Sequence, residues 1–403
     1  MLDEKTIRVI KSTVPVLEEH GETITTRFYE KLFENHPELL NIFNQVNQKK
    51  GRQQAALANS VYAAAVHIDQ LENILPVVKQ IGHKHRSLGV LPEHYPIVGK
   101  YLLEAMKEVL EDQATEEILT AWEKAYGVIA TAFIDVEQEM YKNAEEQPGG
   151  WSGFRNFIVA DKVKESELIT SFYLKAEDGL PIASFSPGQY VSITINIEGE
   201  KYSHIRQYSL SDAPGKDYYR ISVKREQEND KPDGKISNHL HQKVQPGDIL
   251  PLSAPAGDFI LTKDNSKPVV LISGGVGITP LMSMLNTIVE QQPEREVLFI
   301  HATHNGKYHA MQTEVQQLSA TNSQVQSYFC YTTPTDQDRT DQRFDKEGYL
   351  NPDLLVSLIP FTEAEYYFCG PVSFMRTIKE GLEAANVPAE HIHYEFFGPA
   401  MQL

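Results

Sequence analysis

The change in hydrophobic period near residue 150 is the feature that most constrains the fold of this 403-residue chain. Apolar residues recur at helical spacing from residue 2 to about residue 143, without a run of period two. After the segment 145–153 (EEQPGGWSG) the period becomes two, and Val191, Ile193, Ile195 and Ile197 alternate with polar residues. The segment therefore predicts a linker between an all-α part and a part built on strands.

Helix-breaking residues divide the first part into about six to eight predicted helices. The expected breaks lie at Gly21, Pro37, Gly51, Pro76, Pro92 and Ala114-Thr115. Pro76 and Pro92 suit the first turn of a helix, where the missing N–H group has no intrahelical role.

The second part predicts two further domains. Short strands separated by Gly, Pro and Asp turns continue to about Phe259, with one helix near residues 236–244, which indicates a small antiparallel barrel. From about Lys267 strands and helices alternate, which indicates a mostly parallel α/β sheet. The strands are expected at 269–273, 297–302, 325–331, 366–369 and 391–396, and the helices after Pro280 and near 311–318 and 372–385. We expect domains at residues 1–147, 148–263 and 264–403.

Composition excludes several classes of protein. A net charge of -18 disfavours non-specific binding to nucleic acid or to anionic membranes. The only cysteines, Cys330 and Cys369, form neither a disulfide framework nor a metal-spaced cluster. The charged N-terminus has no basic-then-apolar signal segment, and no apolar run is long enough to span a bilayer. A cytoplasmic protein without stable membrane insertion is the simplest expectation.

His85 is the strongest candidate for a metal ligand. It shares a helical face with Val78 and Ile81, whereas His83, Lys79 and Arg86 are expected to face water. A lone histidine on an apolar face is more often a core residue than a ligand. Upstream, however, Phe43 precedes Gln53 and Leu57, which lie four residues apart and so on one face of another helix. A histidine and a glutamine aimed at each other across apolar walls are similar to a globin haem pocket.

Glu137 is the most informative polar residue of the helical part. It continues the face formed by Tyr126, Ala130 and Phe133, where an unpaired carboxylate would cost several kcal/mol. Two interpretations remain open: a helix end where Glu137 reaches solvent, or a buried carboxylate that accepts the imidazole N–H of His85.

Two tyrosines also remain open in role. Tyr29, one turn before Phe33, is either amphipathic core or a donor to a ligand on iron. Tyr95 begins the helix after His85, on a stripe with Val98 and Leu102.

Together these residues resemble the bacterial flavohaemoglobins, the nitric oxide dioxygenases, over essentially the full chain. The residues that carry the resemblance are Tyr29, Phe43, Gln53, Leu57, His85, Tyr95 and Glu137. The resemblance implies that His85 ligates the iron of haem b and is hydrogen-bonded to a Tyr95–Glu137 pair. It also implies that Tyr29 and Gln53 are the distal residues.

The predicted barrel carries two motifs that suit a flavin. The segment Arg206-Gln207-Tyr208-Ser209 combines a guanidinium for pyrophosphate, an aromatic plane for stacking and a hydroxyl. A surface strand with a salt bridge would have the same sequence, so this alternative stays open. Gly234-Lys235-Ile236-Ser237 opens the helix of the barrel, where free N–H groups favour phosphate. With Pro187-Gly188-Gln189-Tyr190, these motifs resemble the FAD-binding domain of the ferredoxin reductase group.

The predicted α/β domain carries two glycine turns. Ser273-Gly274-Gly275-Val276-Gly277-Ile278-Thr279-Pro280 joins an apolar strand to a helix and lets the backbone approach a diphosphate, although a merely tight turn remains an alternative. It departs from the GxGxxG pattern, because Pro280 replaces the third glycine. Cys369-Gly370-Pro371 follows another strand, and Cys369 is equally well read as a small buried hydrophobe. In the resembling group these loops flank the nicotinamide nucleotide.

The C-terminal segment completes the resemblance. Tyr394-Glu395-Phe396-Phe397-Gly398-Pro399 ends the last predicted strand. The family places an aromatic residue of this segment against the flavin, which matches Phe397. It also pairs a lysine beside the proximal histidine with the glutamate, which matches Lys84 and Glu395.

The resemblance implies an electron route from NADH or NADPH through FAD to haem, where nitric oxide and O2 become nitrate. Two other classes stay open: a haem, flavin or ferric reductase or an alkyl or lipid hydroperoxide reductase, and a globin sensor of oxygen or nitric oxide. A complete reductase half argues against a sensor, which needs no electron-donor sites. We expect small-molecule partners, no nucleic acid and a monomer.

Overall fold

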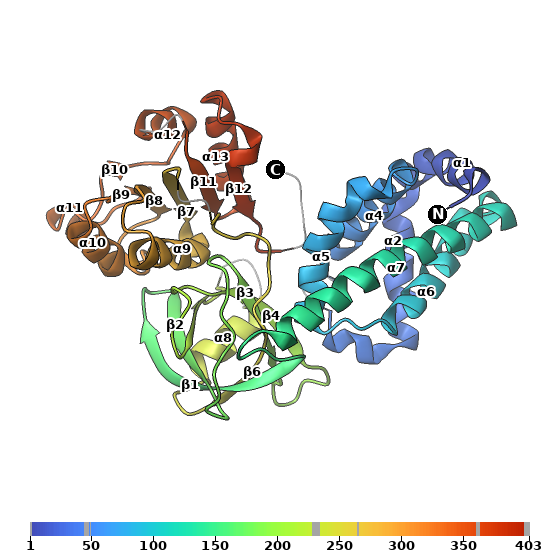
Figure 1. The fold of residues 1–403 in the computed structure, drawn as a ribbon, viewed down its shortest axis with the longest axis horizontal. Helices are drawn as coiled ribbons and strands as arrows, with labels where there is room; N and C mark the ends of the chain where they lie inside the picture. Colours follow the sequence, from blue (N-terminus) through green and yellow to red (C-terminus); the bar gives the residue numbers. More distant parts are fainter. Residues whose placement is uncertain are drawn as a thin grey trace. The chain divides into compact units, whose positions relative to one another are not determined.

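The computed structural model describes residues 2–43, 48, 50–227, 234–263, 266–359 and 363–398 (Figure 1). Contacts divide the chain into two compact units. The first holds the chain up to Phe154 together with Thr194–Arg206, and the second holds Arg155–Ile193 and Gln207–Gly398. The predicted domain boundaries at 147 and 263 stay predictions.

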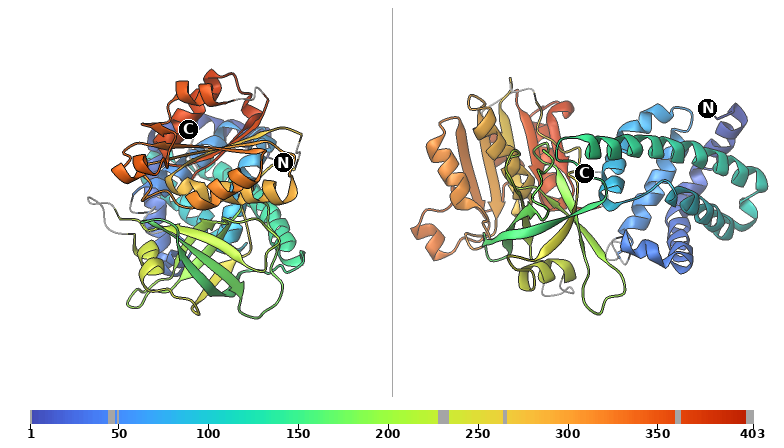
Figure 2. Two further views of the ribbon diagram at one scale, coloured as in Figure 1. Left: turned by 90° about the vertical axis from the view of Figure 1, so that its left-hand side faces the viewer. Right: turned by 60° about the horizontal axis from the view of Figure 1, so that its bottom comes forward.

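The part of the first unit that precedes the linker is helical, as predicted. Six α-helices lie within its described residues: α1 (Glu4–Ser12), α2 (Val14–Asn35), α4 (Arg52–Val66), α5 (Leu75–Leu88), α6 (His94–Leu110) and α7 (Glu116–Glu146). Short 3-10 turns, η1 (Pro37–Asn41), η2 (Leu71–Ile74) and η3 (Glu111–Gln113), connect them. The 31-residue α7 packs against α1, α5 and α6, and Figure 2 shows it from two further sides.

The break predicted at Gly21 is wrong, because α2 continues through it. A Cβ at Gly21 would lie 3.4 Å from Ala58 Cβ, so the small residue serves the close approach of α2 and α4. The chain turns instead at Thr13, whose hydroxyl donates to Ile10 O at 2.6 Å. Pro76 does lie in the first turn of α5, as predicted.

The antiparallel sheet begins directly after the linker. It contains β1 (Phe154–Lys164), β2 (Ile169–Ala176), β3 (Tyr190–Ile195), β4 (His204–Ser209), β5 (Tyr219–Lys224) and β6 (Ile249–Ser253), in the order β4-β3-β6-β1-β2-β5. The predicted helix is α8 (Lys235–Gln242). The strand expected to reach Ile197 ends at Ile195, before a turn at residues 198–199.

The parallel α/β layer of the second unit follows the predicted alternation. Its strands are β7 (Val269–Gly274), β8 (Val297–Thr303), β9 (Val325–Tyr331), β10 (Lys346–Glu347), β11 (Glu365–Cys369) and β12 (Ile392–Glu395), in the order β10-β9-β8-β7-β11-β12. Its helices are α9 (Ile278–Gln291), α10 (Gln312–Thr321), α11 (Asp336–Thr340), α12 (Pro352–Leu358) and α13 (Val372–Ala384).

Two expectations for this layer need correction. Helix α9 begins at Ile278, before Pro280, because proline is tolerated in a first turn where its N–H would be unpaired. The sequence analysis also missed α11 and α12, which are too short to show a helical period. Side-chain caps from Thr335 and Asn351 start these two helices.

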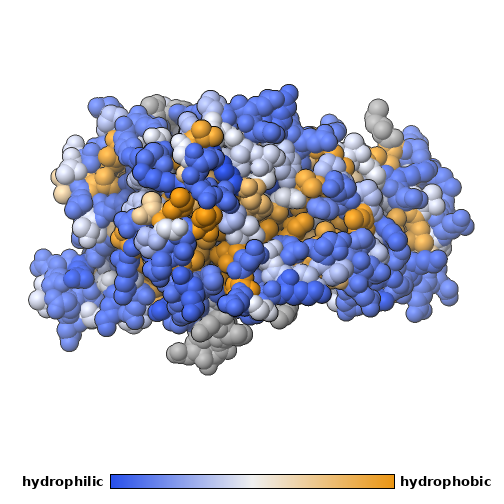
Figure 3. All heavy atoms as spheres, turned by 90° about the horizontal axis from the view of Figure 1, so that it is seen from below, coloured by the Kyte–Doolittle hydropathy of each residue, from blue (hydrophilic) through white to orange (hydrophobic). Residues whose placement is uncertain are grey.

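Hydrophilic residues cover much of the face drawn in Figure 3. Across the described residues, no helix is long and apolar enough to cross a membrane.

Candidate functional site

Three side chains from three helices form a hydrogen-bonded triad in the first unit, with Tyr95 and Glu137 buried and His85 half-buried. Glu137 Oε1 on α7 lies 2.7 Å from Nδ1 of His85 on α5 and accepts a hydrogen bond of 2.6 Å from the Tyr95 hydroxyl on α6. The same hydroxyl lies 3.2 Å from His85 Nδ1. Glu137 is only 3% exposed, and α7 continues for another nine residues to Glu146. The alternative of a solvent-facing helix end is therefore wrong.

The triad determines which ring nitrogen of His85 can bind a metal. A carboxylate accepts from N–H, so Glu137 holds the proton on Nδ1 and leaves the lone pair of Nε2 available. Burial and the neighbouring Glu137 carboxylate raise the pKa of the Tyr95 phenol well above its usual value, so Tyr95 remains a donor.

A tight helix contact supports this geometry. The Tyr126 hydroxyl on α7 donates to Tyr95 O at 2.7 Å. A Cβ at Gly99 would lie 2.5 Å from the Tyr126 ring, so only glycine permits this approach of α6 and α7. Helix packing, rather than loop conformation, thus places Tyr95 beside His85.

The expected water-facing side of α5 is partly wrong. Lys79 is exposed, but Arg86 is only 7% exposed and Nδ1 of His83 is buried. The reason is that α7 packs along α5 and covers residues that an isolated helix would expose.

Tyr29 lies in an aromatic cluster on the other predicted side of the pocket. Its ring centroid is 5.7 Å from that of Phe33 and 5.8 Å from that of Phe43. Burial raises the pKa of the Tyr29 phenol, and the neighbouring Gln48 side chain offsets a part of this effect. The phenol is therefore a neutral donor over the whole physiological range of pH.

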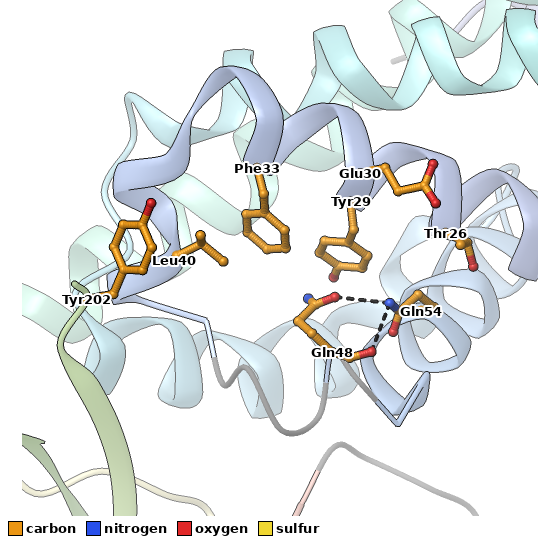
Figure 4. A pocket seen from close by; sticks show the side chains of 8 residues that line it. All are labelled: Thr26, Tyr29, Glu30, Phe33, Leu40, Gln48, Gln54 and Tyr202. Carbon is orange, nitrogen blue, oxygen red and sulfur yellow. Dashed lines mark hydrogen bonds between the residues drawn. The ribbon is translucent and has the colours of Figure 1, made fainter. Parts of the chain in front are cut away.

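A cavity of about 350 Å³ adjoins the Tyr29 side chain (Figure 4). Within the first unit, its walls combine an aromatic side with polar amides, and they are formed by Thr26, Tyr29, Glu30, Phe33, Leu40, Gln48, Gln54 and Tyr202. Gln54 Nε2 donates to the carbonyl and the side-chain oxygen of Gln48, at 3.2 and 3.1 Å. Neither glutamine was predicted from the sequence. Helix α4 begins only at Arg52, after Gln48, so no helical period indicates the direction of the Gln48 side chain.

Gln53, the predicted distal glutamine, is not one of the side chains that line this cavity. Its Oε1 atom is buried and has no hydrogen-bond partner within the described part of the chain. Leu57, one turn later on α4, packs into the same hydrophobic core as Tyr29 and Phe43. The distal role of Gln53 stays a prediction, and the unpaired amide oxygen suits a polar guest.

The predicted flavin motifs come together at the edge of the barrel. Residues Arg206–Ser209 lie at the end of β4, and the next amide, Leu210 N, donates to Gln189 O at 2.9 Å. Tyr190 pairs with Ala256 on the adjacent segment. Gly188 has φ 104°, and a Cβ there would lie 2.1 Å from Phe259 O, so this turn requires glycine.

Ser237 lies in the first turn of α8, as the motif predicts. Its hydroxyl accepts from Glu226 N at 3.0 Å and donates to Gly234 O at 3.1 Å. A Cβ at Gly234 would lie 2.7 Å from Glu226 Cβ, so the glycine allows the turn to close. A phosphate bound at this end of α8 would accept hydrogen bonds from backbone N–H groups of its first turn.

The two predicted glycine turns of the α/β layer are in direct contact. Strands β7 and β11 are neighbours, with Ser273 opposite Cys369. A Cβ at Gly277 would lie 2.1 Å from Cys369 O, and one at Gly370 would lie 3.2 Å from Gly274 Cα. This close approach leaves the loop 274–280 and the turn 369–371 as one cradle at the carboxyl ends of both strands.

Cys369 is fully buried, and burial raises the pKa of its thiol well above its usual value. It is therefore an unreactive small residue in the wall of the cradle, which agrees with its interpretation as a small buried hydrophobe.

The C-terminal segment is placed only in part. Glu395 lies opposite Cys369 in the β11–β12 register, and Phe396 packs on the core of the layer. Phe397 is 50% exposed, as a ring that stacks on a ligand would be. Gly398 ends the described segment, and Pro399 lies outside the described residues. Lys84 and Glu395 belong to different units, so their pairing stays a prediction.

Three models of known families match the chain, in the order that the change in hydrophobic period predicts. The Globin model matches residues 26–133, the oxidoreductase FAD-binding domain model residues 156–260, and the oxidoreductase NAD-binding domain model residues 271–380.

Whole proteins match as well. A flavohemoprotein of Bacillus cereus is 63% identical over 403 residues, which cover all of both chains. The structure resembles a flavohemoglobin from Malassezia yamatoensis solved with bound FAD and heme, with a TM-score of 0.86, 27% identity, and coverage of 98% of this chain and 100% of that chain. It also resembles the FAD/NAD-binding domain of a nitric oxide dioxygenase from Vibrio cholerae, with a TM-score of 0.56, 38% identity, and coverage of 61% of this chain and 99% of that domain.

Proposed function

The chain belongs to the flavohaemoprotein family, and from this premise we propose that it is an NAD(P)H-dependent nitric oxide dioxygenase. It uses haem b and FAD, and it converts nitric oxide and O2 to nitrate. The relative from Vibrio cholerae carries this activity in its name, and the relative from Malassezia yamatoensis binds both cofactors.

The single observation that carries the proposal is the His85–Tyr95–Glu137 triad. The residues present fit a haem, because Glu137 occupies His85 Nδ1 at 2.7 Å and because Gln53 Oε1 is buried in the same helical unit without a hydrogen-bond partner among the described residues. His85 would hold the iron through Nε2, with Phe43 and Leu57 packing on the porphyrin. Haem iron, when bound, supplies the centre at which oxygen and nitric oxide react.

The chain contributes charge and hydrogen bonds around this centre. The Glu137 carboxylate accepts the Nδ1 proton of His85 at 2.7 Å, which makes the imidazole a stronger electron donor. Tyr95 donates a second hydrogen bond to the same carboxylate oxygen and restricts its orientation. On the predicted distal side, Tyr29 is only 6% exposed and offers one hydroxyl proton from an aromatic cluster with Phe33 and Phe43.

The antiparallel sheet and the α/β layer fit a flavin and a nicotinamide nucleotide. Gly188 and Gly234 open the backbone where the barrel would receive FAD, which Arg206, Gln207, Tyr208, Ser209, Tyr190 and Ser237 would hold. Gly274, Gly275, Gly277 and Gly370 form the cradle that would receive the nucleotide, with Val276, Ile278, Thr279, Pro280, Cys369 and Pro371 as its walls. FAD, when bound, turns a two-electron hydride into single electrons. Phe397 would cover the flavin ring.

One observation favours a second activity of the same centre. A short bond between a buried carboxylate and the metal-binding imidazole also promotes cleavage of an O–O bond, as in haem peroxidases. Reduction of alkyl or lipid hydroperoxides is therefore the second candidate function.

One experiment separates these functions. The purified chain, loaded with haem and FAD, is mixed with NADH without oxygen, with O2, with O2 plus nitric oxide, and with cumene hydroperoxide. Fast NADH oxidation that requires both O2 and nitric oxide and yields nitrate supports the proposal. Turnover only with the hydroperoxide, or no effect of nitric oxide, contradicts it.

The proposal extends to the setting of the enzyme. A monomer in the cytoplasm with no nucleic-acid partner agrees with the net charge of -18 and with the small-molecule substrates. Light scattering after size-exclusion chromatography tests the monomer, and a mass of two chains contradicts it.

A further inference from the structure

An ion pair with a buried arginine joins the antiparallel sheet to the α/β layer inside the second unit. Arg220 on β5 donates two parallel hydrogen bonds of 2.9 Å to the two carboxylate oxygens of Glu314 on α10. The side chain of Arg220 is 5% exposed and that of Glu314 is 28% exposed. A bidentate pair of this kind fixes both the distance and the orientation of the elements that carry it.

The pair extends to the helix that begins at the nucleotide cradle. Asn286 on α9 donates to Glu314 Oε1 at 2.8 Å and to Asp212 Oδ1 at 3.1 Å. Tyr218 holds the other oxygen of Asp212 at 2.8 Å. Since α9 starts at Ile278, within the loop 274–280, any shift of Asn286 moves that loop relative to the barrel.

The barrel end of the network lies next to the flavin motif. Arg220 also donates to the carbonyl of Ser211, only two residues after Ser209. Ser211 N in turn donates to Arg220 O at 2.8 Å, and the Ser211 hydroxyl pairs with that of Ser222 at 2.8 Å. The guanidinium is thus anchored on the strand segment that follows Arg206–Ser209.

We propose that Arg220, Glu314 and Asn286 are positioning residues for hydride transfer, holding the nucleotide cradle at a fixed distance and angle from the flavin. The inference rests on the proposed function of the second unit. None of the three residues belongs to the predicted flavin or nucleotide motifs. Hydride transfer depends steeply on donor–acceptor geometry, and a displacement of about 1 Å can cost about a hundredfold in rate. The network acts on that geometry and leaves the binding surfaces themselves unchanged.

The chain offers a matched control. Lys216 and Glu290 also join the barrel to α9, at 2.6 Å, but their side chains are 30% and 42% exposed. An exposed pair is screened by water and contributes little rigidity. Loss of the Lys216–Glu290 pair therefore removes an ion pair between the barrel and α9, and we expect the relative position of the two to stay unchanged.

The test uses the full chain loaded with haem and FAD. Glu314→Gln keeps the shape but leaves the Arg220 charge uncompensated, and Asn286→Ala removes the amide that joins Glu314 to Asp212. Anaerobic stopped-flow mixing with increasing NADH measures the limiting rate of flavin reduction and the half-saturating NADH concentration. We expect the limiting rate to fall by about tenfold or more in both variants, while half-saturation changes by less than about threefold. Arg220→Lys, which keeps the charge without the fork, should lie between these variants and the wild type.

A second readout does not depend on turnover. Hydrogen exchange of the amides in β5, α9 and α10 should accelerate in Glu314→Gln and Asn286→Ala, and stay at the wild-type rate in Glu290→Gln. The limiting rate in Glu290→Gln should change by less than about twofold.

The outcomes are distinguishable. Wild-type limiting rates in Asn286→Ala and Glu314→Gln overturn the inference, as does an equal fall in Glu290→Gln. If Glu314→Gln does not fold, Asn286→Ala decides alone. A rise in the half-saturating NADH concentration without a fall in the limiting rate also overturns the inference. The residues would then affect NADH binding and not the position of the cradle. A wild-type flavin that NADH does not reduce would instead refute the proposed function.

Discussion

The two sides of the predicted haem pocket differ in how their polar groups are satisfied. On the proximal side, Glu137 Oε1 takes hydrogen bonds from both His85 and Tyr95, so the geometry is complete within the protein. On the distal side, Gln53 Oε1 is buried without a partner in the described residues. A buried unpaired polar atom costs about 1–3 kcal/mol, so the described residues leave the polar groups of the distal side incompletely satisfied. We infer that the proximal side tunes the metal and the distal side receives the ligand.

Removal of the proximal ligand should have the largest effect. His85→Ala removes the imidazole, the side chain of the triad that can bind iron. We therefore expect nitric oxide turnover to fall by at least about a hundredfold and the haem Soret band to be lost. NADH-driven reduction of the flavin should persist, because almost all of the predicted flavin and nucleotide residues lie in the other unit. Exogenous imidazole restores turnover if the defect is the missing ligand. A variant that retains a normal Soret spectrum and turnover removes His85 from the metal site.

Tyr29→Phe should have the next largest effect, because it removes one hydroxyl and almost no volume. A charge-assisted hydrogen bond is worth roughly 1.5–3 kcal/mol, which corresponds to about tenfold to a hundredfold faster O2 release. Carbon monoxide, a neutral ligand that attracts the hydroxyl less, should be released at nearly the wild-type rate. Stopped-flow measurement of both rates separates this effect from a general loosening of the pocket. Equal O2 rates in the two proteins would return Tyr29 to the structural residues.

Glu137→Gln tests the proximal side. A neutral amide accepts the Nδ1 proton more weakly, so the imidazole donates less charge and the haem reduction potential should rise. A hydrogen bond to a charged group is worth roughly 1.5–3 kcal/mol, which sets an upper limit of about 60–130 mV for a one-electron couple. Glu139→Gln, an exposed carboxylate on the same helix, is the control. A midpoint that stays constant or falls in spectroelectrochemical titration would remove Glu137 from the network.

The same contrast explains what could be predicted from the sequence. Glu137 was predictable because a helix repeats its faces, so one carboxylate among Tyr126, Ala130 and Phe133 is conspicuous. The resemblance then singled out Tyr95 as its partner, and the structure brings both to His85. Gln48 and Gln54 were not predictable, because their directions depend on how the chain enters α4 after Gly51.

Long-range pairs of the second unit were equally out of reach. Arg220 and Glu314 are 94 residues apart, and each reads as an ordinary charged residue of a strand or a helix. Only the packing of β5 near α10 makes them a pair. Sequence patterns thus predicted the classes of the elements and the glycine cradles, which local spacing determines, and missed the contacts that tertiary packing creates.

Gln53→Ala tests the distal side, and we expect a smaller effect on O2 release than for Tyr29→Phe. The Gln53 amide N–H group would be a weaker donor to bound O2 than the Tyr29 hydroxyl, worth about 0.5–1.5 kcal/mol, so O2 release should accelerate by about twofold to tenfold. Gln54→Ala is the matched control, since the Gln54 amide donates to Gln48 and is already engaged. An effect of Gln54→Ala larger than that of Gln53→Ala would transfer the distal role to the cavity side chains.

The smallest expected effect is the response of the distal side to pH. An ordinary tyrosine has a pKa near 10 and stops donating as the pH rises through that value. Burial raises the pKa of Tyr29 further, so its proton should remain in place where an exposed phenol would already be lost. The ratio of O2 release rates between Tyr29→Phe and the wild type should therefore stay constant from about pH 6 to about pH 10.5. Measuring the ratio at each pH cancels the titration of other groups, including those of the proximal side. A ratio that falls towards one above about pH 9.5 would mean that the phenol ionises normally and that water reaches the distal pocket.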